Sequence, residues 1–255
     1  MTLIAITRPV SASLGECEIT FIEREPIDLP LARRQHAAYE VALERLGARL
    51  VRLPPADDFP DAVFVEDTAL VLDEVAVIPI MGAGSRRGET AEVARCLTAY
   101  RPLHRLEPPA TLDGGDVMRA GRTLYVGLTA RTNRAAVEQL ERATAPHGYR
   151  VVPIGPTGCL HLKSACTCLG RDVVLANPDW IDVSCLTGLD IMAVAPEEPF
   201  AANALAVAER LVYPGDFPKT RAALERRGFE VITLDTAELR KAESAMTCMS
   251  LVFEA

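Results

Sequence analysis

One unit of sequence recurs along the chain with different residues in each copy. Every copy combines a short apolar strand, a polar turn, a second apolar strand, a loop rich in Pro, Gly and Asn, a helix and a closing strand. In the clearest copy, DAVFVEDTALVLDEVAVIPIMGAGSRRGETAEVARCLTAY, Val71 and Leu72 end the first strand, residues 75–80 form the second and residues 89–100 form the helix. Copies begin roughly forty to fifty residues apart, a spacing typical of supersecondary repeats.

Four further copies follow the same plan. Three of them are TLDGGDVMRAGRTLYVGLTARTNRAAVEQLERATAPHGYRVVPI, LHLKSACTCLGRDVVLANPDWID and ANALAVAERLVYPGDFPKTRAALERRGFEVITL. The fifth is split: AMTCMSLVFEA supplies one strand from the C-terminus, and TLIAITRPV supplies another, followed by a helix over 32–46 and a strand over 49–53. Five such units can bury their apolar sheet faces by stacking around an axis and closing, since closure removes free edges. We therefore predict a closed α/β ring of five ββαβ units, with residues 1–255 as a single domain.

Polar residues stand near the first strand of every unit. Ring closure would point these strand ends at the axis, so residues far apart in the sequence would meet there. The residues concerned are Glu66, Asp67, Asp113, Asp116, His161, Lys163, Asn203 and Cys248. Cys248 thus occupies the same place in its unit as the acids and the histidine occupy in theirs.

The charge balance limits the partners. The chain has 35 acidic and 27 basic residues and a formal net charge of −8. This argues against nucleic acid or an anionic membrane, which require a local excess of Lys and Arg, and it suits a small cationic substrate. No apolar stretch approaches the ~20 residues that span a bilayer, and the N-terminus lacks a basic leader. We expect a cytoplasmic protein whose seven irregularly spaced cysteines are reduced.

The sequence motifs give little support for a bound nucleotide cofactor or metal. Neither a P-loop nor a GxGxxG motif occurs, so no nucleotide cofactor is expected. CLHLKSACTC would permit a zinc site, but structural zinc usually shows paired cysteines two to four residues apart, and C-x-C on a strand is compatible with ordinary core packing. We predict no metal and no cofactor.

Seven segments carry a family likeness. FPDAVFVEDTALV, SRRGET, TLDGGDVM, YVGLTARTN, LHLKS, ANAL…ERLVYPGDFPKTR and TCMSLVF occur in this order from about residue 55 to the end. Together they resemble the dimethylarginine dimethylaminohydrolases of the pentein, or guanidine-modifying, superfamily. The resemblance implies a five-bladed α/β propeller with pseudo-fivefold symmetry. It also implies a homodimer and cofactor-free hydrolysis of Nω-methylated arginine to citrulline and an alkylamine.

The same resemblance implies roles for Cys248 and His161. A lone cysteine is most often a small buried hydrophobe, and a lone histidine is usually satisfied by a backbone carbonyl. In the family, the cysteine of the C-terminal motif is the nucleophile and the histidine of HLK is the proton shuttle. A free thiol has a pKa of about 8.5 and is mostly protonated at neutral pH. A bound cation beside it would favour the thiolate.

Acidic residues are the expected anchors of a guanidinium. Asp113 in DGGD is either a turn residue or a carboxylate that binds the guanidinium through paired N–H···O bonds, and the family has an acid there. Alternation along a strand would point Glu66 and Asp67 to opposite faces. The resemblance favours Asp67 as the second anchor and leaves Glu66 in a supporting network. It also places Asp61 near the substrate α-amine.

Two arginines are candidates for binding a carboxylate. Arg86 and Arg131 each follow a returning strand, in GSRRG and TARTN. Such residues are most often exposed and solvated, but the family uses them to bind the α-carboxylate of the substrate. Arg87 is the weaker candidate in its pair. In the family, backbone near Ala242 contacts the substrate amino group.

Two segments depart from the family pattern. Residues 243–245 are Glu-Ser-Ala, where relatives carry an Asp-Gly-Gly-like stretch before the nucleophile. LGECEITFIEREPIDLP, spanning 14–30, is acidic and stands where such enzymes carry a mobile flap. Gly15 is a candidate hinge for a lid that excludes water.

Three alternatives to methylarginine hydrolysis stay open. The same cysteine–histidine mechanism could act on another guanidine, as in arginine deiminases. These typically carry an Asp two residues after the catalytic histidine, where this chain has Lys163. Amidino transfer to an acceptor amine would use the same intermediate. A non-catalytic propeller that binds arginine analogues is the alternative outside enzymes.

Overall fold

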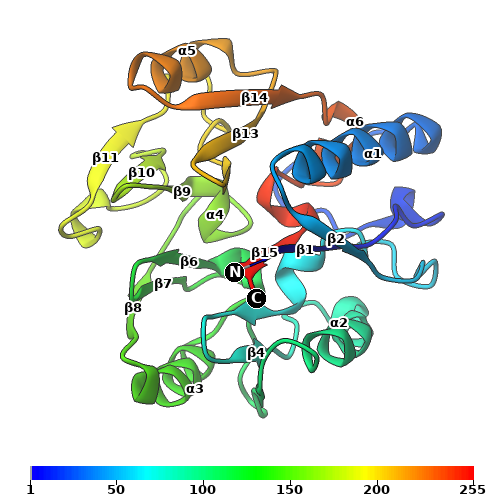
Figure 1. Cartoon of the computed structure of the whole chain (residues 1–255), viewed down its shortest axis with the longest axis vertical. Helices are drawn as coiled ribbons and strands as arrows, with labels where there is room; N and C mark the ends of the chain where they lie inside the picture. The colour runs from blue at the N-terminus through cyan, green and yellow to red at the C-terminus, as the bar shows by residue number, and fades with distance from the viewer. Residues whose placement is uncertain (1) are drawn as a thin grey trace.

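The structure, a computed structural model that describes residues 2–255, consists of five three-stranded sheets arranged around a central axis (Figure 1). In every sheet the middle strand pairs antiparallel with the first strand and parallel with the third. The predicted five-bladed α/β propeller is therefore confirmed. The sheets are β15–β1–β2 (Leu251–Glu254, Leu3–Thr7, Arg49–Arg52), β3–β4–β5 (Leu70–Val71, Ala76–Ile78, Leu103–Arg105), β6–β7–β8 (Val117–Ala120, Thr123–Gly127, Arg150–Ile154), β9–β10–β11 (Cys166–Gly170, Val173–Ala176, Asp190–Ala193) and β12–β13–β14 (Leu205–Val207, Arg210–Pro214, Glu230–Leu234).

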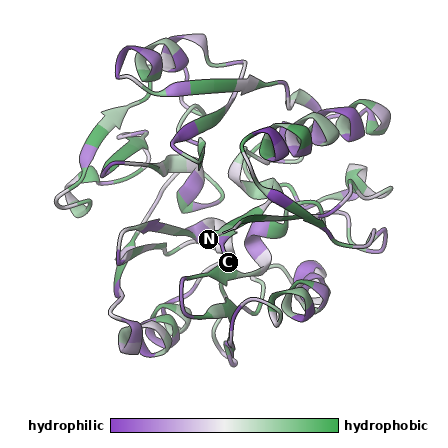
Figure 2. Ribbon diagram, viewed as in Figure 1, coloured by the Kyte–Doolittle hydropathy of each residue, from purple (hydrophilic) through white to green (hydrophobic). Residues whose placement is uncertain are grey.

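The crossover helices occupy the outside of the ring (Figure 1). The crossover helices are α1 (Leu29–Arg45), α2 (Thr90–Leu97), α3 (Arg134–Thr144) and α5 (Pro218–Arg226), and two short helices, α4 (Leu162–Ala165) and α6 (Ala237–Arg240), lie outside the repeat pattern. Hydrophobic and hydrophilic residues alternate along the outer helices, whereas the strands are mostly hydrophobic (Figure 2). This is the pattern of amphipathic helices that cover buried sheets.

Two predicted helices have shifted ends. The helix predicted over 32–46 begins earlier, at Leu29, because the Asp28 side chain accepts a hydrogen bond from the Leu31 N–H and Pro30 is tolerated in the first turn. The helix predicted over 89–100 is shorter, because residues 84–89 form a 3₁₀ turn before α2.

The unit that begins with LHLKSACTC departs from the predicted ββαβ plan. Its strands β10 and β11 are joined by a loop whose only helical piece within the described residues is a 3₁₀ turn, Val183–Cys185. The prediction of a helix in every unit was wrong here. The segment from 177 to 189 contains Pro178, Gly188 and two Asp residues, which favour turns over a continuous helix.

Five hydrophobic layers hold the ring together, one between each pair of neighbouring sheets. The layer between the first and last sheets contains Leu43 of α1, Val212 of β13 and Leu239 of α6. Each sheet has two apolar faces, and a neighbouring blade covers each of them. A blade therefore requires both of its neighbours in order to bury its apolar residues.

The two ends of the chain complete one blade. Strand β1 pairs with β15, with Ile4 opposite Phe253 and Ile6 opposite Leu251. Thr2 and Ala255 exchange two backbone hydrogen bonds of 2.9 Å, and the two termini lie side by side near the axis (Figure 1). The split fifth unit predicted from the sequence is thus confirmed. None of the helices among residues 2–255 has the length and apolar character needed to cross a bilayer.

The axis-facing polar residues stand on short turns rather than on strands. Glu66 and Asp67 belong to the 3₁₀ turn Val65–Thr68, and Cys248 belongs to the turn Thr247–Met249. His161, predicted to start a strand, is instead the residue before α4. With three residues per turn, neighbouring side chains diverge by about 120°, so Glu66 and Asp67 still point to different surroundings, although not through strand alternation.

We expect Leu43→Ala to lower the free energy of unfolding by about 2–5 kcal/mol, because it opens a cavity in the layer that closes the ring. Val41→Ala on the same helix is the control, since Val41 is 43% exposed. Urea unfolding of both variants measures the difference. Equal stabilities would contradict the importance of this layer.

Candidate active site

A small cavity of about 20 Å³ lies where the axis-facing turns meet. The residues predicted for the site that line it are Asp61, Asp67, Arg86, Arg131, His161, Ala242 and Cys248. Two predicted residues do not line it: Asp113 lies behind His161, and Glu66 lines a different, larger cavity. The fold therefore brings the thiol, the imidazole and a carboxylate from three different blades to one place.

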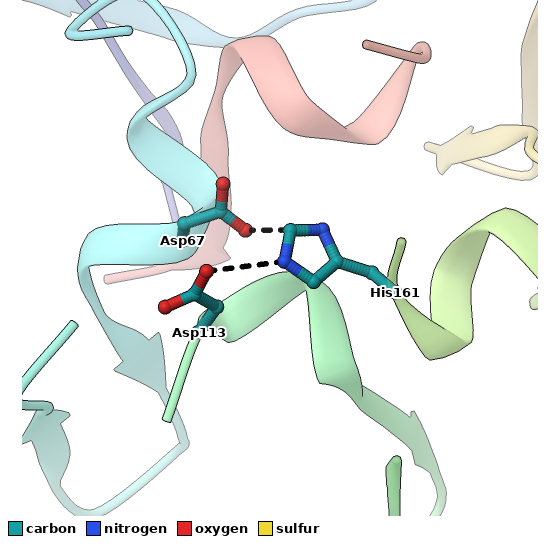
Figure 3. Close-up of side chains that lie close together, drawn as sticks. All are labelled: Asp67, Asp113 and His161. Atoms are coloured by element: carbon teal, nitrogen blue, oxygen red, sulfur yellow. Dashed lines mark hydrogen bonds and ion pairs between the residues drawn. The ribbon is translucent and has the colours of Figure 1, made fainter. Parts of the chain in front are cut away.

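His161 is held between two carboxylates (Figure 3). Its Nε2 lies 3.1 Å from Asp113 Oδ2, and its Nδ1 lies 3.9 Å from Asp67 Oδ1. Burial disfavours the imidazolium, but the charge of Asp67, the hydrogen bond to Asp113 and the charge of Asp116 outweigh burial and raise the pKa of His161 to about 9. The imidazole is therefore protonated at neutral pH, with Nδ1 left without a hydrogen bond among the described residues.

Asp113 faces His161 more closely than it faces the cavity. Its Oδ1 accepts the Gly82 N–H at 2.9 Å while Oδ2 contacts the imidazole. Arg131 Nη1 is 3.9 Å from Oδ2. These contacts orient the imidazole, whereas the role of Asp113 as a direct guanidinium anchor stays a prediction.

Asp67 is the ionised carboxylate of the cavity. It accepts hydrogen bonds from Arg86 at 2.7 Å and from the Gly115 N–H at 2.9 Å. Burial favours the neutral acid, but His161 and Arg86 outweigh it and lower the pKa of Asp67 to about 2. A Cβ at Gly115 would lie 2.7 Å from both Asp67 Oδ1 and His161 Nδ1, so this close packing requires glycine.

The two predicted arginines differ in their contacts. Arg86 is buried and donates to Asp67, to Glu89 and to the Phe64 carbonyl. Arg131 is also largely buried, but its guanidinium makes no hydrogen bond within the described part of the chain. Arg131 is thus the one of the two with donors available for an anionic group. Glu89 was missed by the sequence reasoning, although its position three residues after Arg86 in SRRGET was a usable signal.

Cys248 is a protonated thiol in this environment. Burial raises its pKa, and the carboxylates of Glu66 and Asp67 raise it further. Its Sγ lies 3.4 Å from the Ala245 N–H. The resting site therefore combines a neutral thiol with a cationic imidazole and an anionic Asp67.

A polar floor separates the site from a cavity of about 950 Å³ that runs between the inner strands. Glu66 bonds Lys163 and the Thr247 hydroxyl, and Asn203 bonds Thr247 and the Lys163 carbonyl. The predicted meeting of these residues at the axis is confirmed. Asp116, predicted to meet them, instead accepts bonds from two threonine hydroxyls and the Leu162 N–H, which joins neighbouring blades.

Residues 14–30 cover the cavity as a closed flap. The Glu18 N–H donates to Asp61 at 3.1 Å, and the Glu18 side chain lines the cavity. Arg24 donates to the Gly15 and Cys17 carbonyls. The other lining residues that sequence reasoning did not assign to the site are Phe64, Leu160, Glu243 and Ser244.

Metal-ligand spacing occurs in one group among residues 2–255, Asp67, Asp113 and His161. These side chains already form ion pairs and hydrogen bonds with one another and with Arg86. The set considered for zinc, Cys159, His161, Cys166 and Cys168, does not reach that spacing in this part of the chain.

The fold and this constellation define a pentein-type five-bladed propeller with a cysteine–histidine site. The model of the family "N,N dimethylarginine dimethylhydrolase, eukaryotic" matches residues 21–187. The dimethylarginine dimethylaminohydrolase of Streptomyces coelicolor is 40% identical over 97% of this chain and 95% of that protein. The enzyme of the same name from Pseudomonas aeruginosa is 36% identical over 89% and 90%. The chain belongs to the dimethylarginine dimethylaminohydrolase family.

Solved structures agree with this assignment. A Cys-to-Ser mutant of the Pseudomonas aeruginosa enzyme complexed with citrulline superposes with a TM-score of 0.94, at 34% identity over 99% of this chain and 100% of that one. The N-terminal domain of the arginine dihydrolase ArgZ reaches a TM-score of 0.89 at 20% identity over 99% and 97%, which shows a common fold.

We expect Asp67→Asn to lower the pKa of His161, because it removes the largest of the charges that raise it. NMR titration of the imidazole resonances measures the change. Asp58→Asn is the control, since Asp58 is exposed and makes no side-chain hydrogen bond. An unchanged imidazole pKa in Asp67→Asn would contradict the electrostatic account of this site.

Proposed function

We propose that this protein hydrolyses Nω-methylated arginine, as dimethyl- or monomethylarginine, to citrulline and an alkylamine through a thiouronium on Cys248. The observation that carries the proposal is that Cys248, His161 and Asp67 line one small cavity in a member of this family. The names of the relatives, and the citrulline bound to the Pseudomonas aeruginosa protein, support the substrate class.

The charges of the residues around the cavity indicate where each group of the substrate binds. The guanidinium is placed against Asp67, with Asp113 behind the imidazole and Glu66 in the floor as a supporting network. Arg131 has donors available for the α-carboxylate, and Arg86 contributes less directly because Asp67 and Glu89 already bind most of its guanidinium. Asp61 and the backbone at Ala242 would bind the α-amine.

The bound cation activates the thiol. Burial and two carboxylates keep Cys248 protonated in the free protein. A positive charge about 4 Å from the sulfur contributes roughly 4 kcal/mol at an effective dielectric constant of about 20, which corresponds to about three pKa units. Guanidinium binding therefore lowers the pKa of the Cys248 thiol and raises the fraction of attacking thiolate; the released proton goes to bulk water, because His161 already carries its own.

His161 then moves one proton in each half-reaction. The thiolate attacks the central guanidinium carbon, and His161 Nδ1–H protonates the departing amine as the C–N bond breaks, which leaves the thiouronium. Water attacks the thiouronium and gives one proton to Nδ1. The C–S bond then breaks, and the second proton of that water passes from the new oxygen to the departing sulfur, which releases citrulline and restores the Cys248 thiol. Asp113 at Nε2 and Asp67 near Nδ1 stabilise the imidazolium.

The two alternative activities, deiminase and amidinotransferase, are distinguished by their own assays. Lys163 bonds Glu66 in the floor and stands where deiminases carry an Asp, which favours an alkylated over an unsubstituted guanidine. Relative turnover of arginine and its methylated forms, and product analysis with an acceptor amine, distinguish deiminase and amidinotransferase activity. We also propose that residues 1–255 act as one domain, in a cytoplasmic homodimer.

We expect Cys248→Ser and His161→Ala to lose nearly all citrulline production from dimethylarginine, by roughly 10³-fold or more, while remaining folded. Mass analysis of acid-quenched wild type should show a thiouronium adduct on Cys248. Lys219→Ala, on an exposed side chain, is the control. A wild-type protein that binds substrate without forming citrulline or an adduct would favour the non-catalytic alternative.

Turnover should fall as pH rises through about 9, because the proton donor to the amine is lost when His161 deprotonates. Asp113→Asn should move this alkaline limb of kcat/KM to lower pH, because it weakens the hydrogen bond that stabilises the imidazolium. A limb that stays in place in this variant would contradict His161 as the acid.

A further inference from the structure

The cavity at the site is smaller than the proposed substrate. The substrate therefore needs a route from the surface to this cavity. The cavity measures about 20 Å³. A second cavity of about 530 Å³ adjoins it, and the two share Leu160, Glu243 and Ser244 in their linings. The 950 Å³ axial cavity shares no lining residue with the site, because the Glu66–Lys163 pair and Thr247 lie between them.

This second cavity, here the side chamber, opens to solvent. Phe21 of the flap and Phe200 border it and are 50% and 55% exposed. Trp180 packs edge-to-face on Phe200 and supports that side of the mouth. The side chamber therefore connects the surface with the wall of the reaction cavity.

The charges that line the side chamber suit a cation. Its two basic residues are each paired with an acid outside it, Arg240 with Asp216 and Lys241 with Glu238. Its three acidic residues make no ion pair within the described chain; they are Glu23, Glu25 and Glu243. Unbalanced acids in a cleft concentrate cations and raise their association rates.

Glu243 stands in the wall between the two cavities and also fastens the flap. Its carboxylate accepts the Thr20 N–H at 2.7 Å and the Phe21 N–H at 2.9 Å. Its backbone has a φ of 55°, a conformation that is uncommon for a non-glycine residue. An arriving guanidinium competes with these two N–H groups for the carboxylate, so the cation can release the flap that closes the site.

We infer that the side chamber is the vestibule through which the cationic guanidine reaches Cys248, and that Glu243 is its gate. This inference rests on the proposed function for the identity of the cation. It assigns a function to the Glu-Ser-Ala segment before the nucleophile.

Phe200→Lys and Phe200→Glu test the route, because they remove the same exposed ring and differ only in charge. At low salt, we expect kcat/KM for dimethylarginine to be roughly tenfold lower in the Lys variant than in the Glu variant. The difference should shrink at high salt through screening. Val41→Lys and Val41→Glu, at another exposed apolar position, are the matched control for the field of the whole protein and should differ little.

Thiol labelling gives a readout that does not require turnover. Cationic aminoethyl methanethiosulfonate and neutral methyl methanethiosulfonate are compared by the mass of the Cys248 peptide. The cationic reagent should label the Phe200→Lys variant more slowly than Phe200→Glu, whereas the neutral reagent should not distinguish them. Glu243→Ala should speed labelling by the neutral reagent several-fold, because the flap loses two hydrogen bonds.

The two readouts separate failure of the vestibule from failure of the proposed function. Charge-dependent labelling without citrulline production would support the vestibule and overturn methylarginine hydrolysis. Citrulline production with equal kcat/KM and equal labelling in the two Phe200 variants would overturn the vestibule. Unchanged neutral labelling in Glu243→Ala would overturn the gate.

Discussion

Burial of apolar sheet faces between neighbouring blades is the constraint on which the rest of the structure depends. Each three-stranded sheet must bury its apolar faces against another element, and every layer between blades is shared by two of them. The last layer forms only when β15 pairs with β1, so the C-terminal segment that carries Cys248 is fixed by ring closure. The reaction site is therefore a consequence of closure: a blade missing from the ring would displace the residues that meet at the axis.

Charge balance at the axis explains the resting state of the site. Several buried carboxylates surround one thiol and one imidazole, which favours protonation of both. In the proposed mechanism the thiol is unreactive until a cation arrives, and the imidazole already carries the proton that the leaving amine needs. Arg86 and His161 keep Asp67 ionised, and Glu89 binds the Arg86 guanidinium from behind. In that mechanism the acids that keep the free Cys248 thiol protonated also favour a cationic ligand. The bound cation in turn favours the thiolate.

The flap, residues 14–30, and the segment just before Cys248 are joined by hydrogen bonds around the site. Glu18 contacts Asp61, and Glu243 binds the backbone at Thr20 and Phe21. The sequence showed only that both segments differ from the family pattern. Their contact over more than two hundred residues of chain explains why the two departures belong together: an acid at 243 has a partner in the backbone of this particular flap.

The sequence by itself determined the five repeats and the split fifth unit, because apolar periodicity is a local property of the chain. Its contiguous motifs, which are also local, singled out Cys248, His161, Asp67 and Arg131 as candidate site residues. It could not determine that Asp113 bonds the imidazole, that Glu89 occupies the guanidinium of Arg86, or that a 3₁₀ turn rather than a crossover helix joins β10 to β11 in the part of the chain described. Only the tertiary structure decided these points. Hydrogen-bond partners and pKa values depend on distances between blades and on burial, and closure of the ring sets both.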